Sequence, residues 1–223
     1  MVDFFGNGLC IHCYIAKNEL QDFADFNQLS EASWREKNDT LQEEVSELLK
    51  KYPEKSHDDI VDSYSWELHL NQFKYPSLHR ESLIITIFNF IEHQLNSLCH
   101  IYYESIDSDL KLADMNGRGV ERALLFLKKV VKIDFSSFGA EISIIKGVNH
   151  VRNTIVHNGG ILPNEADAKV NKFVSKANHM SGSAGRSINI HAEFIGYFIE
   201  EILLVFFDKL EQEVQKYIQS YHT

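Results

Sequence analysis

The sequence contains little that would build a disulfide-rich, secreted or membrane-spanning protein. It has only three cysteines in 223 residues, too few for the disulfide framework of a small secreted domain. The start of the chain lacks the basic residues that precede the apolar part of a signal peptide. The most apolar stretch, residues 195–207, is interrupted by Glu200 and Glu201, so no run is long enough to cross a bilayer. We therefore expect a soluble, cytoplasmic protein without membrane contact.

The cysteine pair near the N-terminus does not complete a zinc site. Cys10 and Cys13 have the C-x2-C spacing of zinc ligands, but a structural zinc ion usually needs a second pair of ligands at similar spacing. The third cysteine, Cys99, stands alone. We expect reduced, partly buried thiols, and neither a metal nor another cofactor.

Proline and glycine are also scarce, which favours long helices. The chain has 3 prolines and 11 glycines, and most of them fall between segments with helical periodicity. The hydrophobic content of 44% and the aromatic content of 12% are sufficient for a packed core. No segment shows the strict alternation that is typical of strands. The sequence therefore predicts an all-α fold.

Helical periodicity and capping signals predict where the helices lie. Ser30 resembles an N-cap, Tyr52-Pro53 and Tyr75-Pro76 resemble helix ends, and residues 77–105 form the strongest amphipathic segment. The small-residue segment 180–187 lacks the Gly-Lys-Ser/Thr ending of a phosphate-binding loop and is interpreted as a linker. The expected helices are residues 9–28, 30–51, 56–74, 77–105, 117–132, 138–158, 163–178 and 190–219.

Positive charge is scarce overall but concentrated in one region. The chain has 22 Lys and Arg against 32 Asp and Glu, a net charge of −10, which argues against nucleic-acid binding by the surface as a whole. However, the net charge is −12 over residues 1–110, +5 over residues 111–176 and −3 over residues 177–223. This asymmetry indicates that the basic region meets an anion; ordinary variation in surface charge is the alternative.

The basic region contains the motif Arg152-Asn153-Thr154-Ile155-Val156-His157, followed by Asn158-Gly159-Gly160 as a helix stop. Arg152 is a permanent cation that can hold two phosphate oxygens. His157 can transfer a proton near neutral pH, and Asn153, four residues earlier on the same helix face, can orient it or bind substrate. These groups suit metal-free cleavage of a phosphodiester. In the alternative, Arg152 pairs with an acidic neighbour and His157 merely caps the helix.

The six motif residues resemble the R-x4-H signature of the HEPN superfamily, many of whose members are ribonucleases. Residues 77–105 resemble the long central HEPN helix, with Glu92 as the acidic residue that often lies near the catalytic pair. On this resemblance Glu92 would anchor Arg152 or tune His157; a structural ion pair is the alternative. Lys146 and His150 are further candidates for substrate contacts. The likeness covers roughly residues 77–219 and predicts an N-terminal helical extension, residues 1–76, before a HEPN-like domain, residues 77–223.

One histidine is too few for both proton transfers, so a two-fold dimer would bring two Arg/His pairs to one cleft. The resemblance implies the same composite site, and with it a metal-independent endoribonuclease that leaves a 2′,3′-cyclic phosphate. It also implies a toxin or antiphage-defence effector with RNA as substrate and an antitoxin or regulatory protein as a further partner. The acidic N-terminal third would shield the basic site or bind that regulator. The alternative function is a non-catalytic HEPN-like helical module for dimerisation or partner binding.

Overall fold

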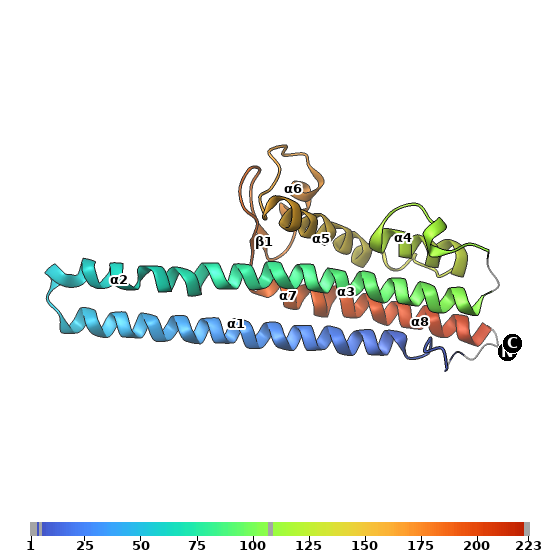
Figure 1. Ribbon diagram of the computed structural model, residues 1–223, viewed down its shortest axis with the longest axis horizontal. Helices are drawn as coiled ribbons and strands as arrows, with labels where there is room; N and C mark the ends of the chain where they lie inside the picture. Colours follow the sequence, from blue (N-terminus) through green and yellow to red (C-terminus); the bar gives the residue numbers. More distant parts are fainter. Residues whose placement is uncertain (1–3, 5, 107–108, 221–223) are drawn as a thin grey trace.

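The computed structural model describes residues 4, 6–106 and 109–220, and it confirms the all-α fold. A long antiparallel helical hairpin dominates the molecule (Figure 1). One side of the hairpin is α1 (His12–Lys51), and a 3-10 turn, η1 (Glu54–Ser56), leads to the other side. The returning side comprises α2 (His57–His69), the π-helical η2 (Leu70–Lys74) and α3 (Tyr75–Ser105). No helix in the described part of the chain is long and apolar enough to cross a bilayer.

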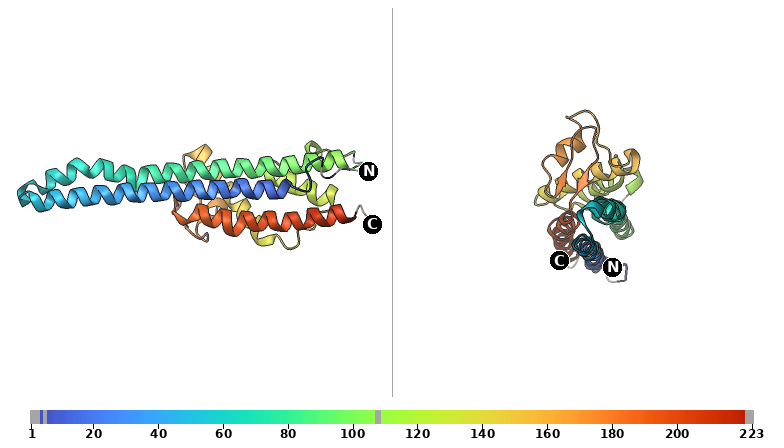
Figure 2. Two further views of the ribbon diagram at one scale, coloured as in Figure 1. Left: turned by 90° about the horizontal axis from the view of Figure 1, so that it is seen from below. Right: turned by 90° about the vertical axis from the view of Figure 1, so that its left-hand side faces the viewer.

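The remaining elements pack along one half of this hairpin (Figures 1 and 2). A continuous helix formed by α7 (Glu193–Tyr197), the π-helical η5 (Phe198–Leu203) and α8 (Leu204–Ser220) lies beside α1. The helices α4 (Gly119–Phe126) and α5 (Gly139–Asn158) pack on α3, and α6 (Lys169–Val174) packs on α5. The short elements are η3 (Leu112–Asp114), η4 (Leu127–Val131), β1 (Met180–Ser181) and β2 (Asn189–Ile190).

One hydrophobic core joins the inner half of the hairpin to the other helices. From α1 it includes Cys13, Ala16, Leu20 and Ala24, which recur every three or four residues and so face one direction. Two of these four residues are alanines, whose small side chains let α1 approach its neighbours closely. The expected domain boundary between residues 76 and 77 falls in the first turn of α3, and the core extends across it.

The outer half of the hairpin has no core of its own. No residue between 42 and 70 is buried, whereas Leu41 and Asn71 on either side of this segment are buried. Residues 42–70, here called the outer arm, extend beyond the rest of the molecule (Figure 1). They carry eight acidic and three basic residues, so the excess negative charge of the N-terminal third is partly located on a projecting surface.

Two expected helix boundaries in the hairpin are wrong. Ser30 does not cap a helix; it lies inside α1 and its hydroxyl donates to the Phe26 carbonyl at 2.9 Å, a bond that serine commonly forms within helices. Pro76 does not end a helix, because the turn before it is π-helical. The Tyr75 N–H bonds to the Leu70 carbonyl, five residues earlier, and this wider turn accommodates the proline ring and its missing N–H.

The segment between α6 and α7 is a packed hairpin and not a linker. The strands β1 and β2 pair antiparallel, and their connecting loop is bonded to Leu162, which donates to the Arg186 carbonyl at 2.9 Å and accepts from the Gly185 N–H at 3.1 Å. Alternation of polar and apolar residues cannot be recognised in strands of two residues. This is the physical reason why the sequence pattern does not indicate them.

Candidate active site on helix α5

The motif that contains Arg152 and His157 occupies the last turns of α5, at the position expected from the sequence. The buried face of α5 anchors the helix in the core through Ile145, Val148 and Val151. The helix ends at Gly159, whose φ of +59° is a left-handed conformation that glycine adopts readily. The N–H groups of Gly159 and Gly160 both bond to the Thr154 carbonyl. This cap fixes the exposed His157 at the end of the helix.

Arg152 is half-buried between α5 and α3, and its guanidinium is held by two amide oxygens. Nη2 donates to Oδ1 of Asn89 at 2.8 Å, and Nη1 donates to Oδ1 of Asn153 at 3.0 Å. Among the described residues no carboxylate forms an ion pair with Arg152, so the pairing with an acidic neighbour is not observed there. Neutral acceptors orient the guanidinium without neutralising it, which leaves its charge available to an anion.

His157 lies in an open cavity of about 320 Å³ between α5 and α6. Arg152 and His157 differ by about 140° around the helix axis, so they lie on different sides of α5. Asn153 connects the two sides, because its Oδ1 binds Arg152 while its side chain lines the cavity. The lining residues are His150, Asn153, Thr154, His157, Asn158, Lys169 and Val170. We call this space the His157 cavity.

The same cavity contains a second histidine and a lysine. Burial, and then the charge of Lys169, lowers the pKa of His150, while Glu121 acts in the opposite direction. A lowered pKa keeps the His150 ring neutral at neutral pH, so that the ring can accept a hydrogen bond or a proton. Lys169 is exposed and adds an ammonium group. The cavity therefore presents two imidazoles and a cation to any molecule that enters it.

Glu92 does not make the contact expected with Arg152. In the described structure it has no ion pair, and its carboxylate lies against Gly119 at the beginning of α4, where an added Cβ would lie 2.8 Å from Oε2. Asn89, one turn earlier on α3, contacts Arg152 instead. Lys146 lies 3.8 Å from the Glu121 carboxylate in an exposed ion pair, which contributes little to stability, and it is not among the residues that line the His157 cavity.

Neither Asn89 nor Lys169 can be recognised as a site residue from the motif, because both contacts depend on how helices pack. Each nevertheless has a signal in the sequence. Asn89 is a polar residue three positions before Glu92 in a helix that is otherwise mostly apolar. Lys169 is the first of three lysines, with Lys172 and Lys176, that recur at helical spacing.

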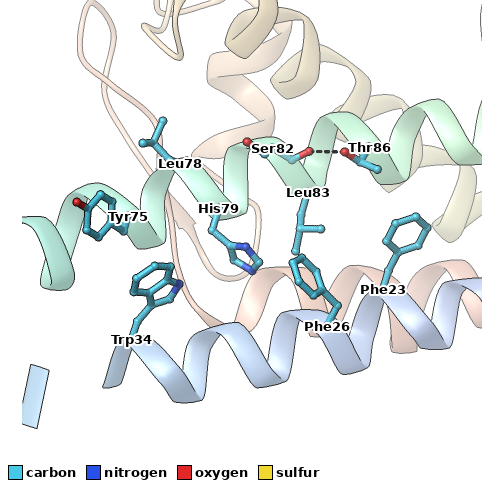
Figure 3. Close-up of a pocket in the computed structure, with 9 residues that line it drawn as sticks. All are labelled: Phe23, Phe26, Trp34, Tyr75, Leu78, His79, Ser82, Leu83 and Thr86. Carbon is cyan, nitrogen blue, oxygen red and sulfur yellow. Dashed lines mark hydrogen bonds between the residues drawn. The ribbon is translucent and has the colours of Figure 1, made fainter. Parts of the chain in front are cut away.

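A larger cavity of about 500 Å³ lies between α1 and α3, away from the motif (Figure 3). Phe23, Phe26 and Trp34 point into it from α1 (Figure 3), and aromatic and aliphatic side chains form most of its lining. One imidazole lines it, that of His79, whose pKa is lowered by burial. The Thr86 hydroxyl is already bonded to the Ser82 carbonyl at 2.9 Å. No charged groups converge in this cavity, so we assign it no catalytic role.

The three cysteines are free thiols, and Cys13 and Cys99 are buried. Burial raises the pKa of both thiols to about 12, so they are protonated at neutral pH and unreactive as nucleophiles. In the part of the chain that the structure describes, no three His, Cys, Asp or Glu side chains are grouped closely enough to hold a metal ion.

Comparison with family models, with curated proteins and with solved structures gives no match for this chain. The resemblance to the HEPN superfamily therefore rests on the motif residues and on the helical pattern around them. Two structural observations do not depend on that resemblance. Amide oxygens orient the Arg152 guanidinium, and a cavity lined by two histidines lies beside the same helix.

Proposed function

We propose that this protein is a metal-independent endoribonuclease of the HEPN type. One observation carries the proposal: Arg152 is fixed by the Asn89 and Asn153 amides and by no described carboxylate, on the helix that also places His157 in a cavity. An oriented and unneutralised guanidinium is suited to two oxygens of a phosphodiester. A histidine nearby supplies the proton transfer that cleavage requires.

In the proposed reaction a base removes the proton from an RNA 2′-hydroxyl, and that oxygen attacks the adjacent phosphorus. Arg152 stabilises the additional negative charge of the phosphorane. An acid then protonates the 5′-oxygen as its bond to phosphorus breaks, which leaves a 2′,3′-cyclic phosphate and a 5′-hydroxyl. We assign one proton transfer to His157 and the other to His157 of a second copy across a two-fold dimer. The neutral ring of His150 contacts the substrate within the cavity.

The resemblance that motivates this activity also motivates its biological setting. A ribonuclease of this kind would act in the cytoplasm as a toxin or an antiphage-defence effector, and a regulatory protein or antitoxin would restrain it. The acidic outer arm, residues 42–70, is the surface that we assign to binding that regulator, because it projects away from α5 and α6 and so does not shield the basic region of its own chain (Figure 1). Its projection from the core and its net negative charge support this assignment.

The proposal is tested by incubating a mixed pool of single-stranded RNA with the protein in the presence of EDTA. We expect the wild type to leave cyclic-phosphate ends. His157→Ala should slow cleavage at least about 100-fold, as loss of a general acid or base does. Arg152→Lys keeps the charge but loses bidentate binding, and it should slow cleavage by about 100-fold.

His100→Ala is the matched control, because His100 is an exposed histidine on α3 whose ion pair with Glu104 joins residues of the same helix surface. This variant should cleave at the wild-type rate. Thermal unfolding followed by circular dichroism confirms that every variant is folded. A folded wild type that leaves RNA intact, or a His157→Ala variant as active as His100→Ala, would overturn the proposal.

The alternative function is a non-catalytic helical module for dimerisation or partner binding. It is favoured by large apolar side chains on the hairpin that face solvent, namely Phe26, Leu29, Trp66 and Phe73, each more than half exposed. Trp66 and Phe73 both contact the ring of His69, with centroid distances of 5.8 Å and 5.7 Å, and monomeric proteins seldom leave such grouped side chains on their surface without a binding role. Under this alternative the folded wild type does not cleave RNA, so the same experiment separates the two functions.

A further inference from the structure

A second cavity lies beside the His157 cavity along the same helices. It has a volume of about 340 Å³ and is formed by α5, by α6 with the turn that follows it, and by α7. The ring of Phe173 on α6 packs against Gly147 of α5, where an added Cβ would lie only 2.1 Å from the ring. Phe173 also lines this second cavity, whereas Lys169 and Val170, one turn earlier on α6, line the His157 cavity. The α5–α6 contact therefore separates two neighbouring cavities.

An aromatic ring forms one wall of this second cavity. The ring of Tyr197 is half-buried, with its centroid 5.7 Å from that of His179 and 6.3 Å from that of Phe194. Burial and then the charge of Glu201 raise the pKa of Tyr197, so its hydroxyl is protonated at neutral pH. A flat ring that is fixed on two sides is the kind of surface on which a nucleic-acid base stacks.

Positive charge connects the two cavities. Lys169 lines the His157 cavity, while Lys172 and Lys176 line the second cavity. All three side chains are exposed, and none has an ion pair or a side-chain hydrogen bond within residues 4, 6–106 and 109–220. Lys169 and Lys172 are three residues apart on α6, and Lys176 lies in the turn that follows the helix, where its N–H donates to the Phe173 carbonyl at 3.0 Å. Unpaired lysines in a row beside an aromatic ring match the alternating phosphates and bases of a single strand.

We propose that α6 and the turn after it form a binding track for single-stranded RNA, in which Lys169, Lys172 and Lys176 contact phosphates and a base stacks on Tyr197. The strand continues from this base into the His157 cavity, a direction that rests on the proposed function. Binding of the strand itself does not depend on cleavage. The chain is acidic overall, so the track also explains how RNA is held by a protein with a net charge of −10.

The test measures binding of a fluorescein-labelled, fully 2′-O-methylated single-stranded oligonucleotide by fluorescence anisotropy. This probe lacks the attacking hydroxyl and cannot be cleaved by the proposed reaction. Tyr197→Ala should weaken binding about tenfold, the typical effect of removing one stacking partner, and Tyr197→Phe should retain most of the affinity. Lys172→Ala with Lys176→Ala should lower the slope of log affinity against log salt by about 1.4, because each phosphate contact on a single strand contributes about 0.7.

The matched control is Lys128→Ala with Lys129→Ala, which removes the same charge from an exposed pair on η4. It should leave the salt slope unchanged. Equal slopes for the two double variants, or a folded wild type that does not bind the probe, would overturn the track. Wild-type binding that Tyr197→Ala weakens, together with intact RNA in the cleavage assay, would retain the track and reject the ribonuclease. If the Tyr197 and Lys172/Lys176 variants bind the probe as tightly as wild type and still cleave RNA, the track is rejected and the ribonuclease is retained.

Discussion

At the scale of single residues, the proposed chemistry depends most on the uncompensated charge of Arg152. Two neutral acceptors, Asn89 and Asn153, orient this side chain. A carboxylate at either position would hold the guanidinium just as firmly, but it would also neutralise the charge that is meant for phosphate. Orientation and charge can therefore be separated experimentally by changing one atom of Asn89.

Asn89→Asp should keep the protein folded and yet lower its activity, because the new carboxylate retains an oxygen acceptor for Nη2 of Arg152 but forms an ion pair with it. We expect the free energy of unfolding to stay within about 1 kcal/mol of wild type and RNA cleavage to fall at least about tenfold. Asn89→Ala should lower both quantities, with about 1 kcal/mol lost in stability for the missing hydrogen bond.

Urea denaturation and single-turnover cleavage measure the two effects of the Asn89 variants. Asn18→Ala is the control, since Asn18 is an exposed amide on α1. Full activity of Asn89→Asp would show that the reaction does not need an unpaired charge on Arg152. The lack of a carboxylate partner for Arg152 among the described residues would then no longer support the proposed function.

The sequence predicts where the motif lies on its helix, but it does not predict which residues of other helices contact the motif. The spacing of Arg152 and His157 and the glycines after Asn158 place both residues at the end of a helix, and the structure confirms this. The amide partner of Arg152 comes from α3, 63 residues earlier in the chain. Local patterns contain no information on such a pairing, which is why Glu92 and not Asn89 is expected there.

At the scale of the elements, the approach of α6 to α5 holds both cavities in place. Gly147 permits this approach, because Phe173 occupies the space in which any other side chain would begin. Alanine is favoured over glycine inside helices by about 1 kcal/mol. Helix propensity therefore predicts that Gly147→Ala stabilises the protein, whereas packing predicts that it destabilises the protein. The sign of the measured change in the free energy of unfolding shows which effect is larger.

We expect Gly147→Ala to destabilise the protein by about 1–3 kcal/mol, the usual effect of overpacking a core, and to weaken oligonucleotide binding by displacing α6. Gly196→Ala is the control, because Gly196 lies within α7 and has open space where the Cβ would be. This variant should be more stable by up to about 1 kcal/mol. Urea denaturation of both variants gives the comparison. Stabilisation of similar size in both would mean that the α5–α6 contact yields easily and does not position the cavities.

Element boundaries can be predicted where a local signal decides them. The expected segments 77–105 and 138–158 agree with α3 and α5 to within two residues, since apolar periodicity and a glycine cap act locally. The boundaries at Ser30 and Pro76 fail, because packing between the two sides of the hairpin favours continuous helices. A π-turn at η2 allows α3 to include a proline, and periodicity cannot reveal that turn in advance.

At the scale of the whole molecule, the charges are separated in space as well as in sequence. The outer arm, with its excess of acidic residues, projects away from the core, while α5 and α6 pack on the inner half of the hairpin (Figure 1). Arg152 and His157 lie on different sides of α5. A single phosphate can therefore contact Arg152 of one copy and His157 of another more easily than it can contact both residues of the same chain. This geometry favours a site shared by two copies.

Mixing of subunits tests the composite site directly. Wild type and His157→Ala chains are exchanged at a constant total concentration, and cleavage is measured against the fraction of wild type. If each site needs His157 from both copies, activity follows the square of that fraction, so that equal mixing leaves about a quarter of the activity. Light scattering establishes the dimer, and mixing with His100→Ala, which should leave activity constant, controls for the exchange. A linear dependence would exclude the shared site and assign the second proton transfer to His150, which lines the same cavity in the same chain.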